Sequence, residues 1–154
     1  MKHDVREIAR NFQIPGNFIS AEPIGGGHIN DTYMSSYQQD GKQACYIHQR
    51  INSNVFREPA LLMENMLRVT CHQRHKLEAA GCLDSWKRAL TLLLADDHQP
   101  FYEDSQGSIW RTYVFIENSQ TNDFVDSPDQ AYQAARAFGE FQRQLVDMPG
   151  EWLH

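Results

Sequence analysis

The sequence has no apolar run long enough to cross a membrane and no block of basic residues. Its 14 lysines and arginines are outnumbered by 20 aspartates and glutamates, which leaves a formal net charge of −6. This balance argues against nucleic acid and anionic membrane surfaces as partners. The N-terminus also lacks the apolar segment of a signal peptide, so we expect a cytoplasmic protein.

Cysteine is scarce and irregularly spaced. The three cysteines, Cys45, Cys71 and Cys82, are odd in number and include no C-x-x-C pair. Neither a disulfide framework nor a cysteine-based zinc site is expected from them. Of the 154 residues, 41% are apolar and 22% charged, which is typical of a globular domain with its own core.

Three consecutive glycines, Gly25 to Gly27, mark the N-terminal part of the chain. β-prone runs precede them at 18–24 and follow them at 32–34, which predicts two strands joined by a tight connection. Because glycine permits positive φ and has no Cβ atom, the N–H groups of such a connection can approach a nucleotide phosphate. The same glycines also suit an ordinary hairpin. A P-loop is not indicated, since no Gly-Lys-Ser/Thr motif opens a helix after them.

Turn and cap signals predict the remaining elements. Asp4 with Glu7 indicates the cap of a short helix that ends near residue 13. Asp40-Gly41 predicts a hairpin leading into a third strand over 43–51. Alternation along that strand places Gln49 on the face of Cys45, Ile47 and Ile51, which we expect to be the apolar face.

The second half of the chain is expected to add one long helix, further strands and a final helix. The long helix runs from 60 to about 79 and is ended by Gly81. Strands are expected at 88–94, near 100–102 and at 108–116. Ser127, Pro128 and Gln130 predict the cap and first turn of the last helix.

Several motifs together resemble the aminoglycoside phosphotransferase and choline kinase superfamily, most closely its N-acetylhexosamine 1-kinase type. They span nearly the whole chain and are Gly-Gly-Gly-His-Ile-Asn-Asp-Thr-Tyr at 25–33, Gln-Arg-Ile-Asn at 49–52, Val-Phe at 55–56, Leu-Met-Glu-Asn at 62–65, Arg-Val-Thr at 68–70, Trp-Arg at 110–111 and Phe-Gly-Glu-Phe-Gln at 138–142. The resemblance implies an α+β fold. It would comprise a protein-kinase-like N-lobe over 1–116, with a five-stranded antiparallel sheet and one long helix, a hinge over 117–127, and the first helix of an incomplete C-lobe over 128–154.

The resemblance also implies a set of nucleotide-binding residues. They surround a bound ATP in the expected fold and are Gly25, Gly26, Gly27, His28, Asn30, Ile47, Gln49, Arg50, Glu64, Phe115, Ile116 and Glu117. Asn30 would steady the glycine connection or touch a phosphate. Glu64 would present an acid from the long helix to the third strand, and Ile47 would line the adenine pocket. Residues 115–117 would form the hinge that meets adenine.

One departure from the family pattern concerns charge. Kinase-like folds place a lysine on the third strand, where it pairs with the nucleotide phosphates. Gln49 stands there in this sequence, and its neighbour Arg50 is the nearest cation. Either Arg50 reaches the phosphates through a distortion of the strand or another group neutralises them. Arg50 fits equally well as a solvent-facing residue paired with an acid.

A second departure concerns catalysis. The catalytic loop H-x-D-x-x-x-x-N and the acidic metal-binding motif after it are absent, and Asp123 with Asp126 lies before the helix that should precede them. We therefore interpret the chain as the N-terminal ATP-binding part of a sugar kinase, inactive alone, whose Mg²⁺ ligands and sugar-binding residues belong to a full-length form.

The alternative interpretation is a non-catalytic lobe that binds a nucleotide or a protein. Under either interpretation the last helix carries an apolar stripe of Ala134, Phe138, Phe141 and Leu145 that would meet large-lobe helices. Left uncovered, it is expected to favour self-association.

Overall fold

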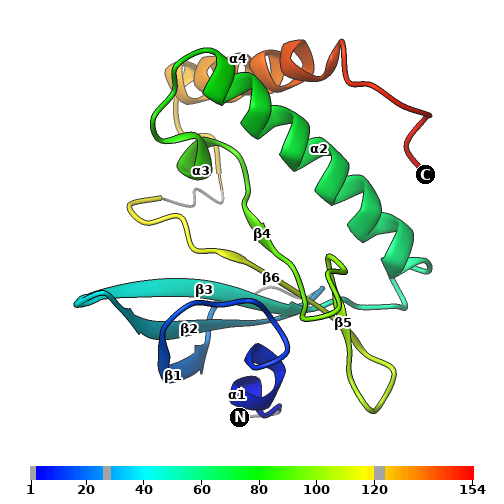
Figure 1. Ribbon diagram of the computed structural model, residues 1–154. Helices are drawn as coiled ribbons and strands as arrows, with labels where there is room; N and C mark the ends of the chain where they lie inside the picture. Colours follow the sequence, from blue (N-terminus) through cyan, green and yellow to red (C-terminus); the bar gives the residue numbers. More distant parts are fainter. Residues whose placement is uncertain (1–2, 26–28, 120–123) are drawn as a thin grey trace.

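The computed structural model describes residues 3–25, 29–119 and 124–154. Their elements in chain order are helix α1 (Val5–Ala9), strands β1 (Asn17–Pro23), β2 (Asp31–Gln39) and β3 (Lys42–Arg50), helices α2 (Pro59–Ala79) and α3 (Ser85–Arg88), strands β4 (Leu92–Leu93), β5 (Tyr102–Glu103) and β6 (Ile109–Val114), and helix α4 (Pro128–Leu145). The fold is α+β, with one antiparallel sheet (Figure 1).

The sheet has six strands in the described part of the chain, one more than the five that the family resemblance implies. Its order is β1-β2-β3-β6-β4, and β5 also pairs with β6. The extra strand arises because β6 serves two partners along one edge. Tyr102 of β5 pairs with Trp110 near the start of β6, whereas Leu92 of β4 pairs with Tyr113 near its end.

Local signals set most turns and caps as expected. Asp40 and Gly41 both have positive φ, 46° and 79°, as a two-residue type I′ hairpin requires. Asp4 Oδ1 accepts the N–H groups of Arg6 and Glu7 at 3.1 and 3.2 Å, which caps α1. Ser127 Oγ likewise accepts the N–H of Gln130 at 3.2 Å.

Two expected boundaries are wrong, and tertiary pairing explains the first. Helix α1 ends at Ala9 rather than near residue 13, because Phe12 pairs with Ala95 and the Gln13 N–H donates to Leu94 O at 3.0 Å. The strand expected from residue 88 is confined to Leu92–Leu93, and Arg88 instead ends the short helix α3.

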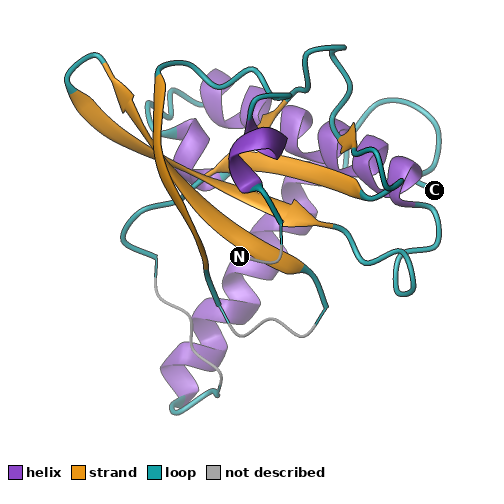
Figure 2. Ribbon diagram, turned by 90° about the horizontal axis from the view of Figure 1, so that it is seen from below, coloured by secondary structure: helices purple, strands orange, loops and turns teal. Residues whose placement is uncertain are grey.

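Both faces of the sheet are covered. Helix α1 lies below the sheet and the long helix α2 above it (Figure 1), and in the view from below α1 stands in front of the strands (Figure 2). The α1 side holds the larger apolar core, formed by Val5, Ile8, Phe12, Tyr33, Ala95 and Trp110. The expectation that the Ile47 face of β3 is the apolar one therefore needs correction. Tyr46 and His48, on the opposite face, are buried as well.

Helix α4 lies beside α2, on the side away from the sheet (Figure 1). None of its residues is buried. Phe138 is 62% exposed, so the apolar stripe of this helix is largely uncovered in the monomer.

Candidate functional site

The connection between β1 and β2 is the first part of the candidate site. Ile24 N–H donates to Thr32 O at 3.0 Å, so the two strands stay paired up to the glycines. Gly25 has φ of 75°, a left-handed conformation that favours glycine. Gly26, Gly27 and His28 lie outside the described residues.

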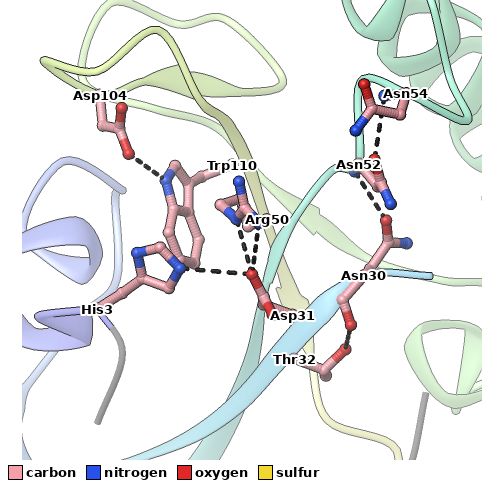
Figure 3. Close-up of polar contacts among 9 residues, drawn as sticks. All are labelled: His3, Asn30, Asp31, Thr32, Arg50, Asn52, Asn54, Asp104 and Trp110. Atoms are coloured by element: carbon pink, nitrogen blue, oxygen red, sulfur yellow. Dashed lines mark hydrogen bonds and ion pairs between the residues drawn. The ribbon is translucent and has the colours of Figure 1, made fainter. Parts of the chain in front are cut away.

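Asn30 joins this connection to the segment that follows β3. Its Oδ1 accepts the Asn52 N–H at 3.0 Å, and Asn52 Oδ1 accepts the Asn54 N–H at 3.0 Å (Figure 3). Thr32 Oγ1 donates to Asn30 O at 3.4 Å. Asn30, directly before β2, is therefore tied to the segment that follows β3.

Arg50 points to the α1 side of the sheet, where it pairs with an acid. Its Nε donates to Asp31 Oδ2 at 2.8 Å, and Nη2 lies 2.7 Å from the same oxygen. His3 Nε2 is 3.4 Å from Asp31 Oδ2, so one carboxylate lies between two basic groups (Figure 3). The structure therefore agrees with the interpretation of Arg50 as a residue paired with an acid, here Asp31.

Gln49 lies on the other face of β3, towards α2, and holds a cation that sequence reasoning did not assign to the site. Arg111, directly opposite on β6, donates from Nε and Nη2 to Gln49 Oε1 at 3.0 and 2.7 Å. Its Nη1 lies 2.7 Å from Met66 Sδ of α2. Gln49 Nε2 donates to Thr32 Oγ1 at 3.0 Å, which completes a polar row across β2, β3 and β6.

Arg111 is the partly buried cation of this row. No carboxylate lies within ion-pair distance of it among the residues that the structure describes. Burial lowers the pKa of Arg111 from its ordinary value, an effect that the nearby Tyr113 opposes. Its only sequence signal is a charged residue inside an aromatic and β-branched strand.

Ile47 and Tyr113 continue the same face of the sheet. They are paired across β3 and β6, and Ile47 is 4% exposed. Burial raises the pKa of Tyr113, while Arg111 acts in the opposite direction. Ile47 and Tyr113 thus lie next to Gln49 and Arg111 on this face and make it apolar there.

Glu64 projects from α2 but does not meet this row. The side chain is about half exposed, and Oε2 lies 3.6 Å from His154 Nε2. Met66, two residues further along α2, is the side chain that contacts Arg111. The structure therefore does not bring Glu64 to Gln49 or Arg50.

The expected hinge follows β6. Phe115 N–H donates to Cys45 O at 3.0 Å, which continues the pairing with β3, and Ser119 Oγ donates to Ile116 O at 3.0 Å. Glu117 is exposed. Residues 115–117 thus lie at the end of the strand that carries Arg111.

A buried histidine joins the central strands on the α1 face. His48 is fully buried and is hydrogen-bonded to Ser35 Oγ at 2.7 Å and Thr112 Oγ1 at 2.8 Å. Burial lowers its pKa to about 4, so the ring is neutral at pH 7. Because all three side chains are inaccessible to solvent, we interpret the group as structural.

A second structural group surrounds Trp110 at the end of the same face. Trp110 is fully buried, and its Nε1 donates to Asp104 Oδ2 at 2.8 Å (Figure 3). Burial raises the pKa of Asp104, but the hydrogen bonds from Trp110, Ser108 N and Gln106 N outweigh it, so the net shift is downward. The ring of His3 meets Trp110 edge-on at 5.1 Å.

The described residues contain no group of three metal-ligating side chains. Asp123, part of the superficial metal motif, lies outside them. Over the same residues, every helix is too short or too polar to cross a bilayer. Cys45, Cys71 and Cys82 are all free thiols.

No model of a known protein family matches the chain. The candidate site comprises a glycine connection, a polar row across three strands, and a cation that contacts only neutral groups among the described residues.

Proposed function

We propose that this chain is the ATP-binding small lobe of a small-molecule kinase, related to the N-acetylhexosamine 1-kinase type, in which a full-length form transfers the γ-phosphoryl group to a sugar hydroxyl. The motifs named above support this proposal, as does the order of strand, glycine connection, two strands, long helix, strands and final helix. Its place of action would be the reducing cytoplasm.

The observation that carries the proposal is Arg111. A half-buried guanidinium normally requires an anionic partner, because desolvation of its charge must be offset by a strong interaction. Here Gln49 and Met66 supply only neutral acceptors, on the face that the resemblance assigns to the nucleotide. A phosphate oxygen would provide the missing negative charge, and the planar guanidinium suits phosphate geometry.

Arg111 would replace the lysine that kinase-like folds place on the third strand. Gln49 supplies no charge, and Arg50 is held by Asp31. Arg111 would neutralise the phosphates from β6, and Gln49 would hold the guanidinium in place through its two hydrogen bonds. The lysine function would thus move from β3 to the paired position on β6.

ATP fits the described residues better than Mg²⁺ does. Gly25, in its left-handed conformation, and Asn30 hold the connection that would cover the phosphates. No set of carboxylates is gathered to hold a metal ion in the described part of the chain. We therefore assign binding and orientation of ATP to this chain and no step of metal-assisted chemistry.

The test is an ATP titration of the full chain by calorimetry. We expect Arg111→Gln to weaken ATP binding at least about tenfold, since a hydrogen bond to a charged group contributes about 1.5–3 kcal/mol. Arg57→Gln is the matched control, because Arg57 is exposed and lies outside the row. Equal affinities for the two variants would rule out the Arg111 assignment.

A non-catalytic lobe that binds a nucleotide or a protein is the second candidate. The absence of a catalytic loop and the uncovered stripe of α4 favour it for the chain by itself. If this candidate is right, the chain should bind ATP without Mg²⁺-dependent phosphorylation of N-acetylhexosamines. It should also self-associate through Phe138 and Phe141 as its concentration rises. Measurable turnover would decide against it.

A further inference from the structure

A pocket of about 730 Å³ lies between α4 and the pair α2 and α3. This volume is within the range of small-molecule sites, about 300–1,000 Å³. One face of α4 forms one wall, and the other comes from the second half of α2 and the end of α3; Figure 1 shows these three helices together above the sheet. The lining residues are Gln73, Leu77, Arg88, Gln133, Arg136, Ala137, Glu140, Phe141 and Gln144.

The pocket is open because α4 is attached to α2 at one end only. Gln144, in the last turn of α4, accepts from His72 Nε2 through its backbone oxygen and from Gln73 Nε2 through Oε1, both at 2.9 Å. Lys76 pairs with Asp147 just beyond the helix. Earlier turns of α4 make no hydrogen bond to α2 or α3 within the described ranges, so a wedge-shaped space remains between the helices.

Two guanidinium groups line this space. Arg88 is at the end of α3 and Arg136 on α4, and neither is in an ion pair in the part of the chain described. The lining carboxylate, Glu140, is taken by Arg143 at 2.6 and 3.0 Å and by Gln144 at 3.3 Å. The hydrogen bond from Arg143 is the main cause of its lowered pKa, and Arg136 adds only a smaller effect.

The positive charge of this pocket contrasts with the acidic character of the whole chain. With a formal net charge of −6, acids outnumber bases by 20 to 14. Arg88 and Arg136 nevertheless face one pocket with Glu140 already neutralised by Arg143, which lies outside the lining. The pocket thus offers positive charge to an anion that enters it.

Three apolar side chains also line the pocket, beside the amides of Gln73, Gln133 and Gln144. Leu77, Ala137 and Phe141 line the pocket, and Phe141 stacks with Phe138 at 6.5 Å between ring centroids and 23° between planes. Gln73 is 9% exposed and adds a buried amide to the floor. An aromatic surface beside two cations fits a ligand that has a flat apolar body and one anionic group.

We propose that this pocket binds a small organic anion, with a carboxylate or phosphate between Arg88 and Arg136 and an apolar ring against Phe141. The site is independent of the proposed ATP face: about two turns of α2 separate Gln73 from Met66, which contacts Arg111. Failure of the kinase proposal would leave this assignment standing.

The test uses phenyl phosphate as the probe, titrated into the full chain by calorimetry. We expect saturable binding with a Kd below about 1 mM. The double variant Arg88→Gln/Arg136→Gln should weaken it at least about tenfold. Both side chains are exposed, so the fold should be preserved, which the circular dichroism spectrum checks. Arg57→Gln, which removes one positive charge elsewhere, should bind phenyl phosphate as the natural chain does.

Two further measurements locate the ligand. Inorganic phosphate, which has no apolar body, should bind at least about tenfold more weakly than phenyl phosphate. Lys42→Gln, at an exposed position at the start of β3, should leave phenyl phosphate binding unchanged. Absence of saturable binding up to about 10 mM would overturn the proposal. So would equal binding of the two phosphates, or a loss with Arg57→Gln or Lys42→Gln as large as that of the double variant.

Discussion

The two faces of the sheet differ in how their polar side chains are paired. On the α1 face, polar side chains are satisfied among themselves: His48 by Ser35 and Thr112, and Trp110 by Asp104. On the α2 face, Arg111 is left with neutral acceptors from Gln49 and Met66. We call the α1 face closed, because its buried polar groups pair with one another. We call the α2 face open, because among the described residues Arg111 contacts only neutral acceptors.

We expect the two faces to differ in how much they contribute to the stability of the fold and to ligand binding. Aromatic and aliphatic burial on the α1 face should supply most of the stability of the lobe. Polar groups on the α2 face contribute little to folding, since burying an uncompensated charge is unfavourable. Substitutions on the two faces should therefore differ in what they damage.

The largest effect should come from the closed face. Trp110→Ala removes a fully buried ring and leaves Asp104 without its indole donor, so we expect unfolding to become easier by about 3–5 kcal/mol. Urea denaturation measures this change. Trp152, which is 94% exposed, provides the control, and Trp152→Ala should change stability by less than about 0.5 kcal/mol. Similar effects of the two substitutions would remove the basis of the comparison.

An intermediate effect should appear with pH. The folded-state pKa of His48 is about 4, below the unfolded value of about 6.5, so the unfolded chain binds more protons between these values. Its contribution is complete above about pH 6.5 and is lost as the pH falls towards 4. Between pH 7 and pH 5 this loss amounts to about 2 kcal/mol.

The measurement is urea unfolding at the two pH values with His48→Gln beside the natural chain. The variant should be less stable at pH 7 but should lose about 2 kcal/mol less on acidification. His75→Gln, at an exposed position of α2, should behave as the natural chain does. A pH dependence that is unchanged in His48→Gln would mean that other groups cause it.

The smallest effect on stability should come from the open face. Arg111→Met replaces an uncompensated cation by an apolar side chain, so we expect the free energy of unfolding to change by less than about 1 kcal/mol or to rise. Arg50→Met, one residue from Gln49 but on the closed face, breaks the pair with Asp31 and should cost about 1 kcal/mol. A large destabilisation by Arg111→Met would show that its neutral contacts are structural.

Local chemistry explains why much of the fold could be predicted. The positive φ values at Asp40 and Gly41 are those that the Asp-Gly pair favours, and the caps at Asp4 and Ser127 need only neighbouring N–H groups. The end of α1 could not be predicted in this way. It depends on the pairing of Phe12 with Ala95, more than 80 residues away in the chain.

The candidate site was only partly accessible to sequence reasoning. Gly25, Asn30 and Gln49 occupy the connection and strand in which the motifs placed them. Arg111 was missed because its role depends on which residue of β6 lies opposite Gln49, and a strand's register is decided by the whole sheet. Glu64 was expected at the row, but the side of α2 that reaches Arg111 carries Met66.

By itself, the sequence determined the acidic character of the chain, the hairpin at 40–41 and the side-chain caps of α1 and α4, because each depends on composition or on residues close together in the chain. Only the tertiary structure decided that Arg50 pairs with Asp31, that Arg111 meets Gln49, and that α4 leaves a pocket beside α2. Those features depend on the register between strands and the distance between helices, which are set by packing across the whole molecule.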